Sequence, residues 1–308
     1  MDIFIIGAAG YIGGSIAARL IGLGHRVSGL TRSADSAAKL SACGIEPMIG
    51  SNTDVDIVRR AASAADAVIN AADVENPYPV ATILAALRGS SKRFIQTSGS
   101  SVVGDKAAGE YSHKVYHEDT PLDALPEKIV RTAIHRQVLA AAHDGVHSIV
   151  ICPPLIYGHG TGLNPHSVQI PKMIQQAQKH GVVRYIGEGE HVWSTVHIDD
   201  VVDAYLLALE KSPAGSFFYL ENGEANFQAI TASIGRLLGM QNGSWSIDEA
   251  IVEWGPQTSW FALGSNSRVR ADKARRMLGW QPKGADLFYE IEHGCYREFL
   301  NPQGETKS

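Results

Sequence analysis

The hydrophobic positions near the start of the chain follow two different spacings. Residues 2–6 are mostly apolar on both faces, as is typical of a strand buried on both sides in a parallel sheet. From Ile12 to Leu23 apolar residues recur every three or four positions, which predicts a helix packed on that sheet. A second apolar run follows at residues 25–30. The pattern therefore predicts a strand, a turn, a helix and a second strand.

The same alternation of apolar runs and helical periods continues along the chain. It predicts further strands at residues 45–49, 67–72, 93–97, 148–152 and 216–220. It predicts further helices at residues 34–43, 54–65, 79–87, 126–142, 167–180, 201–209 and 227–238. Strands that alternate with helices indicate an α/β fold with a Rossmann-type, doubly wound parallel sheet and helices on both faces.

Three glycines lie between the first strand and the first helix. Gly7 allows a sharp turn, Gly10 lets the backbone approach a pyrophosphate, and Gly13 lets the helix pack close to the strand. The start of the helix offers free N–H groups and a positive dipole end to phosphates. We therefore predict a dinucleotide-binding turn, the alternative being a glycine-rich turn without a ligand. The predicted binding residues are Gly7, Ala9, Gly10, Tyr11, Ile12 and Gly13.

The residues after the second strand indicate which dinucleotide binds. An acidic residue there would accept hydrogen bonds from the ribose 2′-hydroxyl of NAD, but the chain has Thr31, Arg32 and Ser33. The guanidinium of Arg32 can pair with a 2′-phosphate, and the two hydroxyls can donate further hydrogen bonds. NADP(H) is the predicted cofactor, and the alternative is an arginine that simply faces water.

Composition and charge exclude several classes of protein. The 308 residues are 44% hydrophobic and 19% charged, as in an ordinary soluble globular protein, and the net charge of −5 leaves no basic surface for nucleic acid or membrane. No segment reaches the about 18 consecutive apolar residues of a membrane span. Cys43, Cys152 and Cys295 have no metal-binding or disulfide spacing. We expect a cytoplasmic protein without a metal, acting on a small molecule. Its oligomeric state stays open, with a homodimer as one option.

Several motifs resemble those of one large enzyme family. They are the Gly-x-x-Gly-x-x-Gly spacing at 7–13, the run Cys-Pro-Pro-Leu-Ile-Tyr-Gly at 152–158, the run Val-His-Ile-Asp-Asp-Val at 196–201 and Gly-Trp-Gln-Pro at 279–282. The chain resembles, over nearly its full length, the extended and atypical branches of the short-chain dehydrogenase/reductase superfamily, the NAD-dependent epimerase/dehydratase-like proteins.

The resemblance implies a domain division and further cofactor contacts. Residues 1–158 would form the dinucleotide-binding Rossmann domain and residues 159–308 mainly a smaller C-terminal α/β substrate-binding domain, with 193–220 returning to the Rossmann sheet. Ala71 and Ala72 would lie beneath the cofactor, and the segment after the sixth strand would face the nicotinamide. That segment comprises Pro153, Pro154, Leu155 and Ile156.

The resemblance also implies a catalytic serine or threonine after the fifth strand. The family position falls on Gly99, so Ser98 or Ser100 would supply the hydroxyl that binds a substrate carbonyl. The alternative is an ordinary serine-rich turn.

The family's Tyr-x-x-x-Lys pair is absent. Its positions fall on Glu127 and Arg131, and a following glutamate falls on His135; the four-residue steps place all three on one helix face. Arg131 could keep the role of the lysine. Tyr111 in the polar loop at 106–125, or its neighbour Tyr116, could replace the tyrosine as proton donor. The alternative is a helix with ordinary exposed charges.

Three functions are compatible with this pattern. The first is an NADP(H)-dependent oxidoreductase that reduces a small carbonyl compound. The second is a non-redox epimerase, dehydratase or isomerase, which would need the same missing pair. The third is a catalytically degenerate sensor of NADP(H). The retained substrate-side motifs favour an enzyme over a sensor, and fold analogy alone does not separate the first two.

Overall fold

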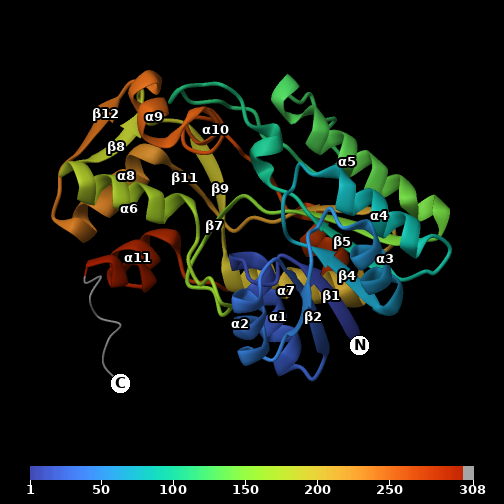
Figure 1. Ribbon diagram of the computed structural model, residues 1–308. Coiled ribbons are helices and arrows are strands. Elements are labelled where there is room, and N and C mark those ends of the chain that lie inside the picture. The colour runs from blue at the N-terminus through green and yellow to red at the C-terminus, as the bar shows by residue number, and fades with distance from the viewer. Residues whose placement is uncertain (301–308) are drawn as a thin grey trace.

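A seven-stranded parallel sheet forms the centre of the molecule in the computed structural model, which describes residues 1–300 (Figure 1). The strand order is β10-β6-β5-β4-β1-β2-β3. The strands are β1 (Asp2–Ile6), β2 (Arg26–Thr31), β3 (Glu46–Ile49), β4 (Ala67–Asn70), β5 (Arg93–Thr97), β6 (His147–Cys152) and β10 (Ser216–Tyr219). Because every pair is parallel, the carboxyl ends of all seven strands lie at one edge of the sheet.

Side chains of β1, an inner strand of the sheet, alternate between two hydrophobic cores. Ile3 and Ile5 of β1 belong to one buried cluster, and Phe4 and Ile6 belong to the other. The first cluster is covered by α1 (Tyr11–Gly22), α2 (Ala34–Ala42) and α7 (Ile198–Lys211). The second is covered by α3 (Val55–Ala64), α4 (Pro77–Leu87) and α5 (Ile129–Ala140). A strand buried on both faces is what its unbroken apolar run predicted.

The second half of the chain forms a smaller layer with its own core. One sheet has the order β11-β9-β7 and another pairs β12 with β8. These strands are β7 (Leu155–Tyr157), β8 (Val183–Ile186), β9 (Val192–His197), β11 (Glu224–Asn226) and β12 (Asn242–Trp245). The helices are α6 (Gln169–His180), α8 (Phe227–Leu238), α9 (Ile247–Trp254), α10 (Pro256–Phe261) and α11 (Leu287–Glu292).

The range 193–220 divides between the two layers. Helix α7 packs on the large sheet and β10 extends that sheet beside β6. Strand β9, however, pairs with β7 and β11 in the smaller layer. Helix α7 also begins earlier than predicted, because the Nδ1 atom of His197 accepts a hydrogen bond from the backbone N–H of Asp199 and caps the helix there.

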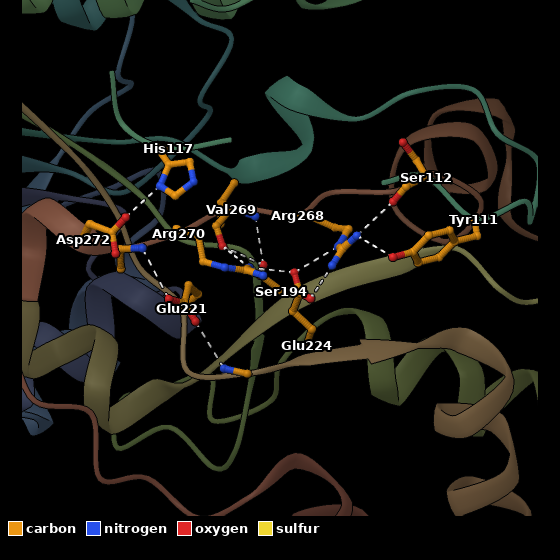
Figure 2. A network of polar contacts seen from close by, with 12 residues as sticks. Tyr111, Ser112, His117, Ser194, Glu221, Glu224, Arg268, Val269, Arg270 and Asp272 are labelled. Atoms are coloured by element: carbon orange, nitrogen blue, oxygen red, sulfur yellow. Dashed lines mark hydrogen bonds and ion pairs between the residues drawn. The ribbon is translucent and has the colours of Figure 1, made fainter. Parts of the chain in front are cut away.

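The long loop at 106–125 is held against a late segment of the chain, as Figure 2 shows. Tyr116 pairs with Val269 in an isolated parallel bridge. The guanidinium of Arg268 donates to both carboxylate oxygens of Glu224 at 3.1 and 2.9 Å and also to the Tyr111 hydroxyl at 2.8 Å. The loop is therefore tied to the small sheet by charge-assisted hydrogen bonds.

The structure confirms the predicted fold class, a Rossmann-type parallel sheet with a smaller C-terminal α/β part. The domain boundary at residue 158 stays a prediction, and residues 301–308 of the second predicted domain lie outside the described part. No helix within residues 1–300 is both long enough and apolar enough to cross a bilayer.

Candidate functional site

The glycine turn after β1 has the geometry that a bound pyrophosphate needs. Gly7 has a φ of +90°, which side-chain-bearing residues rarely adopt. A Cβ on Gly13 would lie 2.3 Å from the Gly7 carbonyl oxygen, so only glycine at this position lets the first turn of α1 pack this close to the strand end. A Cβ on Gly10 would instead approach only that same oxygen, at 3.2 Å, and the rest of its outer side is open. The turn therefore leaves room for a phosphate beside Gly10.

The start of α1 is free to bind an anion. No side chain caps this helix, whose N-cap residue is Gly10. The first N–H groups, which include those of Tyr11, Ile12 and Gly13, thus remain available at the positive end of the helix dipole. The Tyr11 side chain serves another purpose, because it is buried and its hydroxyl donates a 2.8 Å hydrogen bond to the carbonyl oxygen of Gly158. Tyr11 could therefore contact a cofactor through its backbone.

A cavity of about 480 Å³ opens beside this turn, at the ends of β1, β2 and β4. Arg32 and Asp73 are its charged lining residues. The exposed Arg32 side chain makes no hydrogen bond or ion pair within residues 1–300, so its guanidinium is free for a ligand. Six predicted cofactor residues line the cavity: Gly7, Ala9, Thr31, Arg32, Ser33 and Ala72.

The two hydroxyls beside Arg32 differ in their freedom. Thr31 is buried at the end of β2. The Ser33 hydroxyl oxygen accepts a 3.2 Å hydrogen bond from the Ser36 N–H and so caps α2, although its own proton stays available. A 2′-phosphate here would meet Arg32 together with the N-terminus of α2, a setting that suits an anion.

The remaining predicted cofactor residues contribute mainly backbone. Ala71 follows β4 directly, and its carbonyl oxygen would lie 2.9 Å from a Cβ on Gly7. After β6, the Pro153 carbonyl oxygen accepts from the Ser100 N–H, and Pro154 leads into β7. Within β7, Leu155 is buried in the core of the smaller layer and Ile156 is half-buried. Because β7 is an edge strand of its sheet, one side of its backbone is available to a ligand.

Of the two predicted catalytic serines, Ser98 lies in the core. It is 5% exposed, and its hydroxyl is 2.6 Å from Nε2 of His135. Burial, and then the nearby charge of Arg131, lower the pKa of His135 to about 4, so the imidazole is neutral at pH 7. Ser98 and His135 thus form a neutral buried pair.

Ser100 is also committed to a buried contact. Its hydroxyl lies 2.6 Å from the Ser267 hydroxyl, which also donates to the Ser100 carbonyl oxygen at 2.9 Å. This pair fastens the turn after β5 to Ser267, the residue before Arg268. The next serine, Ser101, is only half-buried and is hydrogen-bonded to Arg131 instead. The catalytic roles of Ser98 and Ser100 stay predictions.

Arg131 joins three segments at the carboxyl edge of the sheet. One guanidinium nitrogen donates to the Ser101 hydroxyl at 2.6 Å and to the Gly99 carbonyl oxygen at 3.2 Å. The other lies 2.6 Å from a carboxylate oxygen of Glu75, in the loop after β4. Arg131 is 7% exposed, so its charge acts in surroundings where hydrogen bonds are strong. Arg131 therefore links α5 to the segments that follow β4 and β5, and its catalytic role stays a prediction.

Glu127 does not share the inward face with Arg131 and His135, so that part of the sequence prediction is wrong. Residues 126–128 form a 3₁₀ turn, and α5 begins only at Ile129. A 3₁₀ turn has three residues per turn, so the four-residue spacing of an α-helix does not hold across it. Lys128 turns inward and is 3% exposed, whereas Glu127 turns outward and pairs with Lys106. That pairing lowers the pKa of the Glu127 carboxyl, which remains ionised.

The tyrosines predicted as replacement proton donors lie apart from Arg131's contacts. The Tyr111 hydroxyl accepts from Arg268 in the network of Figure 2, and the Tyr111 ring is 43% exposed. Tyr116 is buried, with the Lys114 ammonium 4.8 Å from its ring centroid. Neither hydroxyl bonds to Ser101, Arg131 or Glu75 in the described structure. Their catalytic roles stay predictions.

Two residues of this site, Glu75 and Lys128, were not predicted from the sequence. Glu75 lies in the short segment between β4 and α4, which carries no recognisable motif. Lys128 directly follows the position matched to the family tyrosine, within the one residue or so by which such a match can be shifted. In the folded structure, though not in the sequence, the neighbouring Ile129 and Val130 are 57% and 49% exposed while Lys128 and Arg131 are buried. Such an inversion of the usual burial marks sites of function.

One group of side chains elsewhere could hold a metal ion. His159, His166 and Glu298 place their ligand atoms within 4.8 Å of one another on the surface. Both imidazoles also face the carboxylate at ion-pair distances, 3.7 and 3.2 Å. The prediction that the protein needs no metal stays a prediction.

Comparison with known proteins identifies the family of this chain. The chain is 32% identical over 309 residues to an uncharacterised protein of Schizosaccharomyces pombe, covering 96% of this chain and 100% of that one. It is 26% identical to a 4-hydroxy-2-methyl-3-oxo-4-farnesyl-3,4-dihydroquinoline-1-oxide ketoreductase of Stigmatella aurantiaca, covering 91% and 92% of the two chains. Its fold matches that of dTDP-glucose 4,6-dehydratase from Bacillus anthracis in complex with NAD, with a TM-score of 0.76, 17% identity and coverage of 99% and 98%. Residues 3–218 match the NAD dependent epimerase/dehydratase family. The resemblance inferred from the sequence motifs is thus confirmed, and the chain belongs to the NAD dependent epimerase/dehydratase family.

Proposed function

We propose that the protein is an NADP(H)-dependent oxidoreductase that reduces a small carbonyl compound. The observation that carries this proposal is the arrangement along the carboxyl edge of the sheet. A cavity with the free guanidinium of Arg32 lies beside the glycine turn, and the buried Arg131, bonded to Ser101, lies farther along the same edge. In an open parallel sheet a ligand lies across this edge.

The residues beside the cavity fit the adenosine and phosphate parts of NADP(H). The open side of Gly10 and the uncapped start of α1 would hold the pyrophosphate. Arg32 would pair with the 2′-phosphate through its planar guanidinium, supported by the Ser33 hydroxyl. NADPH, when bound, would supply a hydride to the carbonyl carbon, and the protein would orient the two reactants.

At the other end of the site, Ser101 and Arg131 would bind the carbonyl oxygen. The Ser101 hydroxyl accepts from Arg131, which leaves its own proton free to donate to a substrate oxygen. The guanidinium would stabilise negative charge that develops on that oxygen, and its contact with Glu75 fixes its orientation. We therefore propose that the more accessible Ser101, rather than the buried Ser98 or Ser100, supplies the hydroxyl that binds the substrate carbonyl.

A relative of this chain supports reduction over the alternative reactions. The ketoreductase of Stigmatella aurantiaca is similar to this chain over 91% of its length, and its name describes a reduction of a ketone. The dehydratase whose fold matches is only 17% identical, so its reaction carries no weight for this chain. Reduction of a ketone by NADPH is therefore the function we infer.

The proposal is tested by titrating the purified protein with NADPH and with NADH, followed by a panel of ketones and quinones. Binding is followed by nicotinamide fluorescence and turnover by nicotinamide absorbance. We expect tighter binding of NADPH and its oxidation with at least one carbonyl compound. Tight binding without turnover on the whole panel would favour a non-redox isomerase or a sensor. Preference for NADH would contradict the role of Arg32.

A further inference from the structure

A buried lysine without a hydrogen-bond partner lies at the carbonyl end of this site. The Lys128 side chain is 3% exposed, and its ammonium makes no hydrogen bond to any residue among 1–300, although the nitrogen itself is not fully enclosed. Its near neighbours are the ring of Phe261, 4.2 Å from centroid to nitrogen, and a carboxylate oxygen of Glu75 at 3.9 Å. Placing an ammonium in such largely apolar surroundings is costly unless it is paired and hydrogen-bonded. The Lys128 ammonium can therefore complete its hydrogen bonding by donating to a bound ligand.

The ammonium shares its surroundings with the groups that would bind the carbonyl. The same Glu75 oxygen that lies 3.9 Å from Lys128 lies 2.6 Å from Arg131. Arg131 in turn donates to Ser101 and to the carbonyl oxygen of Gly99, just beyond the end of β5. Two cations and one carboxylate therefore meet beside the strand end where the substrate carbonyl is expected.

The geometry points to Lys128 as the proton donor to the substrate's carbonyl oxygen, the part that a tyrosine plays in the related enzymes. This inference rests on the proposed reduction and adds the group that completes it. Lys128 lies next to the position matched to the tyrosine, and the 3₁₀ turn at 126–128 directs it inward. Glu75 is a positioning residue, because its carboxylate faces both cations without being placed to react.

The acidity of Lys128 suits this part. Burial, followed by the charge of Arg131, lowers the pKa of the ammonium to about 8, while Glu75 and Glu127 oppose that change. At pH 7 most of the lysine is still protonated, yet it is a stronger acid than an ordinary lysine. A donor whose pKa lies near the working pH is the most effective general acid.

The step balances as a carbonyl reduction. The carbonyl carbon gains a hydride with its electron pair from the reduced cofactor, and the π pair of the C–O bond moves to oxygen. Lys128 passes one proton to that oxygen, which forms the alcohol and leaves a neutral amine. The alcohol and the oxidised cofactor would be the products, and the amine would regain its proton from the solvent, so that one solvent proton is consumed in each turnover. No further oxidant or reductant is needed.

The first test measures the acidity of Lys128 without any substrate. The protein is labelled briefly with acetic anhydride at a series of pH values, and acetylation of the Lys128 peptide is quantified by mass spectrometry. We expect half-maximal reactivity near pH 8. Glu75→Gln should shift it to lower pH, because it removes an attractive charge. A Lys128 that titrates like the exposed lysines overturns the inference.

The second test compares variants in NADPH-dependent reduction of phenanthrenequinone or of another ketone or quinone that the wild type turns over. Lys128→Met should lower kcat by roughly 10²- to 10⁴-fold, the usual contribution of a general acid, with an unchanged Kd for NADPH. Lys128→Arg keeps the charge but cannot release a proton, so it should not restore kcat.

Lys106→Met is the matched control, because Lys106 also lies over the Phe261 ring, at 5.7 Å, but is exposed and paired with Glu127. Its kcat should stay within about twofold of the wild type, as expected for an exposed pair.

The pH profile separates a proton donor from a structural cation. The wild-type kcat for reduction should be constant below pH 8 and fall above it, as the ammonium loses its proton. Full activity of Lys128→Arg, or an unchanged profile in Lys128→Met, overturns the inference while the reductase function stands. If the wild type oxidises NADPH with none of the carbonyl compounds tested, both this inference and the proposed reductase function are overturned. Thermal unfolding of each variant verifies that it folds.

Discussion

The two ends of the site are built in different ways. At the cofactor end, the critical features are backbone ones: the positive φ of Gly7, the close packing at Gly13 and the open side of Gly10. At the carbonyl end, the features are side chains that come together from four regions: the segment after β4, the segment after β5, α5 with the turn before it, and α10. A backbone site is encoded within one short stretch, whereas a side-chain site depends on how distant segments pack.

The difference also shows in how each end meets solvent. Arg32 at the cofactor end is exposed and has no partner within residues 1–300. Arg131 and Lys128 at the carbonyl end are both more than nine-tenths buried. An exposed cation recognises an anionic ligand at little cost to the fold, whereas buried cations depend on neighbours and strengthen electrostatic interactions. The first end is suited to binding and the second to chemistry.

The largest effect is expected from glycine substitutions at the cofactor end. Gly13→Val should unfold at markedly lower denaturant concentration, because its Cβ would lie 2.3 Å from the Gly7 oxygen, and overpacking of this kind costs about 1–3 kcal/mol or more. Gly10→Val is the matched variant, since the outer side of Gly10 is largely open. It should keep most of the stability but lose NADPH binding. Denaturant unfolding and fluorescence titration measure both, and tight NADPH binding by Gly10→Val would refute the turn assignment.

The next effect concerns the choice of cofactor. Arg32→Asp should weaken NADPH binding roughly 10- to 100-fold, because a charge-assisted hydrogen bond contributes about 1.5–3 kcal/mol and a repulsive carboxylate replaces it. NADH carries no 2′-phosphate, so its binding should change little or improve. Parallel titrations with the two cofactors give the ratio of dissociation constants. An equal loss of affinity for NADPH and for NADH would mean that the substitution disturbs the whole cavity rather than the recognition of the 2′-phosphate.

Sequence patterns predicted the cofactor end more completely than the carbonyl end. The turn, the helix start and Arg32 lie within 32 consecutive residues, and periodicity with glycine spacing locates them. At the carbonyl end, Glu75 contacts Arg131 across 56 positions, and no local pattern indicates such a contact. The 3₁₀ turn before α5 also breaks the four-residue spacing on which the match of Glu127 relied. The buried pair of Ser98 and His135 also depends on how distant segments pack, so no local sequence pattern predicts it.

A smaller effect would show whether the Ser98–His135 pair belongs to the core. The folded pKa of His135 is lowered to about 4 from a usual value near 6.5, so between these values the unfolded chain binds more protons. Stability should therefore fall as the pH drops from 7, by about 2 kcal/mol at pH 5 from this residue alone.

The matched variant for this prediction is His135→Gln, which can still hydrogen-bond Ser98 but does not titrate. The loss of unfolding free energy between pH 7 and pH 5 should be smaller in this variant by that same amount. Denaturant unfolding at the two pH values measures it. An identical loss in wild type and variant would mean that His135 is accessible to protons in the folded protein, and would bring Ser98 back as a functional hydroxyl.

The smallest effect is expected where the sequence first suggested a catalytic group. Glu127 lies on the outer side of the 3₁₀ turn, and its carboxylate is paired with Lys106 at the surface. Glu127→Gln should therefore leave kcat and the Kd for NADPH within about twofold of the wild type, as is usual for exposed ion pairs. Because the pairing lowers the pKa of this carboxyl, Glu127 is ionised throughout the neutral range and carries no proton to donate. A large fall in kcat with unchanged NADPH binding would contradict this: Glu127 would then act from the surface side of the turn, and the inward direction of Lys128 would serve packing against Phe261 instead.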